Sequence, residues 1–376
     1  MKKNNFKENL FKICTFIINM IPFLVTGFYI GFASIQLKKN IKESIIVMII
    51  LYIIALISFM FHIIIHEAGH LIFGLLSGYK FVSFRIGSLT LIKENGKLSL
   101  KKFSIPGTAG QCLMMPPEGK EYDCPYFLYN LGGILINVIV SIIFLIISFA
   151  FTLPKFIEII FILSSLIGFS VFLTNGIPLK VGGVANDGYN LISLGKDKLA
   201  RKAFYIQLYA NALLYNGVRP KDMPTEWFYL PEDADFNNSL ISSIKLIEGS
   251  YYYDRHEFEK AKSCYESLLN KSPKMIEFYK NEINCELLFF EIIGECNKEK
   301  INNLYSKKLK QYIKTTLPYY ITKQRLMYAY TLIYEKDKEK AKKYLLGFNK
   351  LIKTYPAKGE IESEKEIIKL IEERGK

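Results

Sequence analysis

The chain has 376 residues, of which 50% are hydrophobic and 22% are charged, and its formal net charge is +14. This apolar fraction is too high for an ordinary soluble enzyme. The basic residues are mostly scattered lysines without an aromatic-basic motif, so we expect no nucleic-acid partner. The long apolar runs precede Pro178 and the remainder is rich in Lys and Glu. The chain therefore reads as a membrane half followed by a soluble half.

Four apolar segments in the first half are long enough to span about 30 Å of hydrocarbon. They cover approximately residues 13–35, 43–78, 126–151 and 156–174. The first segment is longer than the core of a signal peptide and lacks a small-residue cleavage site, so we expect a retained helix. The second exceeds the bilayer thickness at ~1.5 Å per residue and must tilt or project.

Residues 79–123 change in character to short, β-branched and partly alternating runs. These include residues 81–86 and 88–92, and the pair Asn95-Gly96 then precedes a further run at 98–100. Such a pair between apolar runs is typical of a β-hairpin. We therefore predict a small β-hairpin or sheet at the membrane surface.

The segment from about residue 195 onward predicts an all-α soluble domain. A weak tetratricopeptide-like spacing of small and aromatic residues favours paired helices; it consists of Gly249, Tyr252, Ala261, Tyr265, Leu268 and Pro273. Small residues at helix crossings would give the same pattern, so a repeat array is one of two interpretations. The predicted domains are an N-terminal transmembrane helix (1–40), a membrane core (41–195) and a helical domain (196–376).

The second apolar segment contains the motif His66-Glu67-Ala68-Gly69-His70. Residues four apart lie on one face of a helix about 6 Å apart, so His66 and His70 can direct ring nitrogens to one metal ion. Glu67 can take a proton from metal-bound water, as in other H-E-x-x-H sites. The alternative is a polar cluster that only packs helices together. Because these groups are costly in lipid, the motif favours a functional site.

A catalytic zinc usually has three protein ligands and one open position, so the motif predicts one Zn²⁺ and leaves a ligand to be found. We interpret His62, one turn before His66, as lining a water path or packing between helices. His256 lies in a Lys- and Glu-rich helix of the soluble half. Asp187 follows an apolar helix and a Gly-rich turn, and is the best candidate for the third ligand.

Four motifs of the membrane half together resemble the site-2 proteases, a family of intramembrane zinc metalloproteases. They are HEAGH in an apolar helix, Gly133-x-x-x-Asn137, Asn175-x-x-Pro178 and Asp187-Gly188. The resemblance covers roughly residues 44–190. Asp187 lies nine positions after Pro178, a longer spacing than in many members of that family.

The resemblance implies roles for five residues. His66, His70 and Asp187 would be zinc ligands, and Glu67 would be the general base. Asn137 would help to position the substrate or the oxyanion. The β-segment near 81–100 would present the substrate.

The expected function is hydrolysis of a peptide bond in or near the membrane-embedded segment of a membrane protein or membrane-associated peptide precursor. Expected partners are that polypeptide, the lipid bilayer and a protein that binds the helical domain. The alternative is a non-catalytic, metal-containing membrane binding, immunity or scaffold protein, although such a site has no need of Glu67. A transporter is disfavoured because the chain lacks an internal repeat. We expect the protein to lie in a bacterial cell membrane. The Lys and Arg distribution predicts that its N-terminus and its C-terminal domain face the cytoplasm.

Overall fold

The computed structural model describes residues 2–38, 40–94, 96–181 and 184–375. Within them the chain divides into two compact units. The first holds the chain up to Gly78, together with Pro125–Val181 and Ala185–Lys196, and the second holds Tyr79–Cys124, Val184 and the chain from Asp197 on. The domain boundaries expected from the sequence, which place residues 79–124 with the membrane core, stay a prediction.

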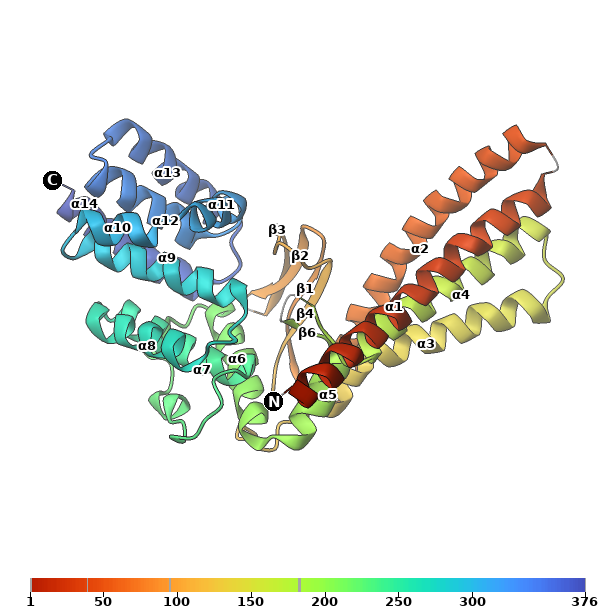
Figure 1. The fold of residues 1–376 in the computed structure, drawn as a ribbon, viewed down its shortest axis with the longest axis horizontal. Helices are drawn as coiled ribbons and strands as arrows, with labels where there is room; N and C mark the ends of the chain where they lie inside the picture. The colour runs from red at the N-terminus through yellow and green to blue at the C-terminus, as the bar shows by residue number, and fades with distance from the viewer. Residues whose placement is uncertain (1, 39, 95, 182–183, 376) are drawn as a thin grey trace. The chain divides into compact units, whose positions relative to one another are not determined.

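Four long helices make up most of the first unit (Figure 1). They are α1 (Lys2–Leu37), α2 (Ile41–Leu76), α3 (Tyr126–Ala150) and α4 (Lys155–Gly176). Among the described residues, these are the helices long and apolar enough to cross a membrane, which confirms the four predicted spans. Large apolar side chains cover their outer faces, such as Phe28 and Phe149, which are 77% and 74% exposed. Such faces suit a lipid environment.

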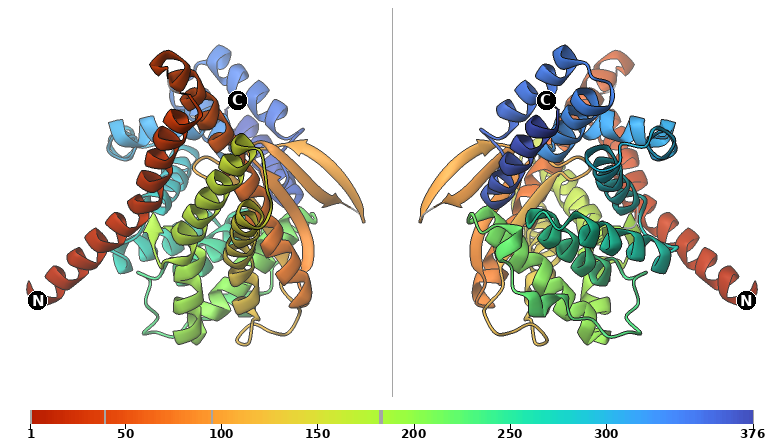
Figure 2. Two further views of the ribbon diagram at one scale, coloured as in Figure 1. Left: turned by 90° about the vertical axis from the view of Figure 1, so that its right-hand side faces the viewer. Right: turned by 90° about the vertical axis from the view of Figure 1, so that its left-hand side faces the viewer.

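Helices α2 and α3 approach each other closely at a pair of glycines. A Cβ atom on Gly69 would lie 2.3 Å from the Gly132 carbonyl oxygen, and one on Gly132 would lie 2.4 Å from the Gly69 oxygen. Glycine is needed at both positions, because small residues let the backbones of membrane helices pack together. Helices α3 and α4 run side by side (Figures 1 and 2). After α4 come the two-residue strands β5 (Lys180–Val181) and β6 (Val184–Ala185), and then helix α5 (Asp187–Lys196).

The second unit begins with an antiparallel sheet in the strand order β3-β2-β1-β4. Its strands are β1 (Lys80–Ile86), β2 (Leu89–Glu94), β3 (Lys97–Lys102) and β4 (Gly110–Met115). The β2–β3 pairing, with Glu94 opposite Lys97, confirms the predicted hairpin, while Asn95 of its turn lies outside the described residues. Strand β4 was not predicted, because its sequence lacks the β-branched residues that signal a strand.

The rest of the second unit is helical, as predicted. Its elements are α6 (Lys198–Tyr215), η1 (Pro220–Asp222), η2 (Thr225–Phe228), α7 (Ser239–Asp254), α8 (Phe258–Lys271), α9 (Glu277–Ile293), α10 (Lys298–Leu304), α11 (Lys307–Thr316), α12 (Ile321–Ala329), η3 (Tyr330–Tyr334), α13 (Lys338–Leu351) and α14 (Lys358–Arg374). Helices α7 and α8 pair, and Gly249 leaves room for the ring of Tyr265, whose Cε1 would lie 2.3 Å from an added Cβ. This packing accounts for the spacing of small residues, and a tetratricopeptide-like repeat stays a prediction.

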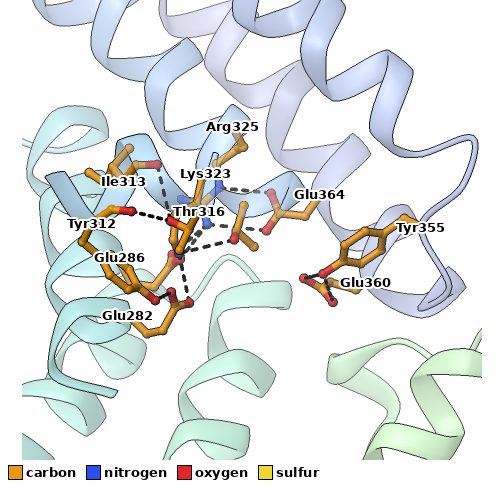
Figure 3. Close-up of polar contacts among 11 residues, drawn as sticks. Glu282, Glu286, Tyr312, Ile313, Thr316, Lys323, Arg325, Tyr355, Glu360 and Glu364 are labelled. Carbon is orange, nitrogen blue, oxygen red and sulfur yellow. Dashed lines mark hydrogen bonds and ion pairs between the residues drawn. The ribbon is translucent and has the colours of Figure 1, made fainter. Parts of the chain in front are cut away.

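A buried arginine joins three helices of this part. Arg325 on α12 is 1% exposed, and its Nη2 donates to both carboxylate oxygens of Glu286 on α9, at 2.9 and 2.8 Å. Its Nε donates to Glu364 on α14 at 3.0 Å (Figure 3). A buried charge is tolerated only with such partners, so these ion pairs fix how the three helices pack.

We predict that Gly132→Ala destabilises the first unit, because the added methyl would force α2 and α3 apart. Overpacking of this kind costs about 1–3 kcal/mol. The check is the thermal midpoint of the full chain in detergent, followed by circular dichroism. Gly31→Ala on α1 is the control, because its Cβ would have no atom within 4 Å. Equal midpoints for the two variants would contradict the close contact.

Candidate metal centre

The two histidines of the HEAGH motif lie one turn apart on α2, and their rings converge. Each of His66 and His70 is 7% exposed, and their Nε2 atoms lie 3.2 Å apart. Gly133 on α3 leaves the space that the rings occupy, because a Cβ there would lie 2.7 Å from His66 Cε1 and from His70 Nε2. Thus α3 contributes to the site by lacking a side chain at this position.

Asp187 at the start of α5 completes the group. Its Oδ2 lies 3.1 Å from His66 Nε2 and 3.3 Å from His70 Nε2. The structure therefore brings together the three ligands expected from the sequence, despite the long spacing after Pro178. Among the described residues, these three form the group of His, Cys, Asp and Glu side chains able to hold a metal ion.

The arrangement of the three atoms fits a zinc ion. Zinc binds imidazole nitrogen and carboxylate oxygen at ~2.0 Å, and a tetrahedron with such bonds has edges of about 3.3 Å. The three distances between the ligand atoms are 3.1, 3.2 and 3.3 Å. Asp187 Oδ2 is buried and has no hydrogen-bond donor among the described residues. Three acceptor atoms that face one point would repel each other without a cation between them, and a fourth position remains for water or substrate.

The backbone of α3 orients His70. The Tyr129 carbonyl oxygen lies 2.7 Å from His70 Nδ1. Because a carbonyl oxygen can only accept, Nδ1 carries the proton and donates it, which leaves the Nε2 lone pair directed at Asp187 and His66. A contact of this kind behind a metal ligand fixes both the tautomer and the direction of the ring.

Asn137 on α3 lies between His66 and His62, and its polar contacts orient His66. His62 Nε2 donates to the Ser164 carbonyl oxygen at 2.9 Å, so Nδ1 of the neutral ring is an acceptor. The amide of Asn137 lies 2.9 Å from that Nδ1 and 3.2 Å from His66 Nδ1. The structure places Oδ1 of Asn137 toward His62 and Nδ2 toward His66. Turning the amide by 180° gives His62 a donor and His66 an acceptor, and it gives up the 3.3 Å contact of Nδ2 with the Gly133 carbonyl. His66 Nε2 then also keeps its lone pair for a metal.

Asn186 holds Asp187 in place, and the sequence analysis did not identify it. Its side chain makes four hydrogen bonds to backbone groups: Nδ2 donates to the oxygens of Thr174 (2.8 Å) and Ile177 (2.7 Å), and Oδ1 accepts from the nitrogens of Leu179 (3.0 Å) and Tyr189 (2.9 Å). The bond from Tyr189 caps the first turn of α5, which Asp187 begins. The sequence did contain a signal for this role: an Asn directly precedes the Asp-Gly pair, and Asn is a frequent residue at the N-terminal cap of a helix.

Glu67 and His256 have different surroundings. Glu67 follows His66 on α2 and is half-buried. His256 is in the second unit with its side chain 40% exposed, 3.9 Å from Glu366. It is outside the group of possible metal ligands, in agreement with the choice of Asp187.

We predict that Asn186→Ala weakens zinc binding roughly 10- to 100-fold, the usual cost of removing a group that orients a ligand. The measurement is the zinc content of the purified protein against increasing chelator. Asn175→Ala is the control, because among the described residues the Asn175 side chain donates to the Val171 carbonyl one turn back in α4, at 3.0 Å. Unchanged zinc retention in Asn186→Ala would show that Asn186 does not position Asp187.

Comparison with known proteins agrees with this site. The model of peptidase family M50 matches residues 54–316, more than half of the chain, and this segment includes the HEAGH motif and Asp187. No curated protein and no solved structure matches the chain. The resemblance to the site-2 proteases is thereby confirmed at the level of the family. The chain belongs to peptidase family M50, the family of the site-2 proteases, and is a membrane metalloprotease.

Proposed function

We propose that the protein is an intramembrane zinc endopeptidase, which hydrolyses a peptide bond in or near the membrane-embedded segment of its substrate. One observation carries the proposal. His66, His70 and Asp187 direct three ligand atoms to a single point in a unit of four apolar helices, and Glu67 follows His66 in the chain. The substrate is a membrane protein or a membrane-associated peptide precursor, because the ligand histidines lie on a helix that can cross the membrane.

The chain's own residues would divide the reaction between them. His66, His70 and Asp187 would hold a zinc ion, whose Lewis acidity would polarise the carbonyl and make water more acidic. Glu67 accepts the proton of the attacking water and passes it to the leaving amine. The His66 and His70 rings keep their direction through Asn137 and the Tyr129 carbonyl.

The role of Asn137 is proposed in two parts. In this structure it is fully buried and contacts both His62 and His66. We therefore propose first that it positions His66. Its predicted help with the substrate or the oxyanion would require the amide to leave one of these contacts, and that role stays a prediction.

The surroundings of the reaction follow from the same proposal. The lipid bilayer hosts the four helices, and the N-terminus and the helical domain would face the cytoplasm of a bacterial cell, as the Lys and Arg distribution predicts. A tetratricopeptide-like helical domain would bind a partner polypeptide. The non-catalytic alternative is not favoured, because the chain belongs to a peptidase family and keeps Glu67.

We predict that Glu67→Gln retains zinc but lowers peptide hydrolysis by a factor of roughly 10² to 10⁴, the usual contribution of a general base. Zinc content and cleavage of a transmembrane peptide are measured on the same preparations. Glu43→Gln is the matched control, because Glu43 lies on the same helix with its side chain 53% exposed, in an ion pair with Lys38.

The outcomes separate the steps of the proposal. Zinc in both variants with cleavage lost only in Glu67→Gln would support it. Full turnover by Glu67→Gln would remove Glu67 from the mechanism. Absence of zinc from the wild-type protein, with the fold intact, would overturn the metal site itself.

A further inference from the structure

His62 is a fully buried polar side chain on α2, one turn before the metal ligand His66. Its ring has apolar neighbours, since the ring centroids of Phe61 and Phe144 lie 5.5 and 6.2 Å from its own. Helix α4 leaves space for it, because a Cβ on Gly168 would collide with His62 Cε1. A polar group in such surroundings is costly in lipid, so His62 requires a functional explanation.

The two ring nitrogens of His62 have different partners. Nε2 lies 2.9 Å from the Ser164 carbonyl oxygen, which can only accept a hydrogen bond, so Nε2 carries the proton. A charged ring would be costly among apolar neighbours, so the ring is neutral and Nδ1 keeps a lone pair. Nδ1 therefore accepts from the side-chain amide of Asn137, which lies 2.9 Å away.

The need of His62 for a donor decides which way the Asn137 amide points. With NH₂ turned to His62, the amide oxygen takes the position 3.2 Å from His66 Nδ1 and accepts its proton. Nε2 of His66 then keeps its lone pair beside Asp187 Oδ2. In the opposite orientation, NH₂ would donate to His66 Nδ1 and to the Gly133 carbonyl. The proton of His66 would then lie on Nε2, the atom that a metal needs.

We propose that His62 is a positioning residue of the metal centre, which holds the Asn137 amide with its oxygen toward His66. The hydrogen bonds then run in one direction, from His66 through Asn137 and His62 to the Ser164 carbonyl. The proposal rests on the metal site of the proposed function. It gives His62 a role beyond the helix packing that we expected from the sequence.

Two substitutions of His62 separate its two hydrogen bonds. An Asn amide occupies the place of Nδ1 and a Gln amide that of Nε2. His62→Asn therefore keeps an acceptor for Asn137, whereas His62→Gln keeps only a donor for Ser164. We expect His62→Gln to lose zinc affinity roughly 10- to 100-fold, the usual cost of removing a group that orients a ligand, and His62→Asn to stay near wild type. A role in packing α2 against α4 alone predicts the reverse order.

Zinc affinity is measured on the full chain in detergent by competition with a chelator, and the thermal midpoint is measured on the same preparations. Ser165→Ala is the control for helix packing. Ser165 is 1% exposed, and its hydroxyl donates to the Ser141 carbonyl at 2.8 Å, a bond between α4 and α3 that does not include the Asn137 side chain. We expect this variant to lose thermal stability and to bind zinc as the wild type does.

The proton positions of the wild-type rings give a second readout. The chain contains four histidines, so nitrogen NMR of the zinc-loaded protein with isotope-labelled histidine can resolve them. The signals of His62 are those that a His62 variant lacks. We expect His62 to carry a proton on Nε2 and none on Nδ1.

The outcomes separate this inference from the proposed function. In proteins with comparable thermal midpoints, a loss of zinc affinity in His62→Asn as large as that in His62→Gln would overturn the inference, as would no loss in His62→Gln. A proton on His62 Nδ1 in the wild-type protein would also overturn it. The expected order of affinities in a protein that hydrolyses no peptide would support the inference and count against the proposed function. Absence of zinc from the wild-type protein would overturn both.

Discussion

The close contact of Gly69 with Gly132 is the packing interaction on which the metal centre depends. Because no side chain separates the two backbones there, the neighbouring turns of α3 lie directly against the histidines of α2. The Tyr129 carbonyl and the Asn137 amide then reach the Nδ1 atoms of the two rings. In lipid a polar group without a partner is costly, so the same contact that packs the helices also satisfies and aims the ligands.

The two units satisfy their buried polar groups in different ways. Around the histidines of the first unit, the partners are a neutral amide and backbone carbonyls, which orient the rings without adding charge. In the second unit, Arg325 is held by full ion pairs with Glu286 and Glu364. The first arrangement leaves a concentration of acceptors that suits a metal ion. The second leaves Glu360 outside the ion pairs, with the Tyr355 hydroxyl as its polar contact among the described residues.

Much of this could be predicted from sequence because the signals are local. Hydropathy gave the four membrane helices, and the i, i+4 spacing placed His66 and His70 on one face. Whether Asp187 reaches the two histidines depends on the path of the chain after Pro178, which residue spacing alone does not determine. The contacts of Asn186 depend on the same path, so they could not be predicted either. Strand β4 lacked a strand-like composition. The network around Arg325 joins three helices far apart in the chain, and a single sequence contains no pattern that pairs them.

The contacts between Leu179 and Asn186 have a consequence for how this chain can vary. The main-chain nitrogen of Asn186 donates to the Leu179 carbonyl oxygen, and the main-chain nitrogen of Leu179 donates to Oδ1 of Asn186. These two hydrogen bonds join the chain at Leu179 and Asn186. The position of Asp187 therefore follows from these bonds and not from the number of residues between them. The length of this excursion is therefore free to differ between relatives.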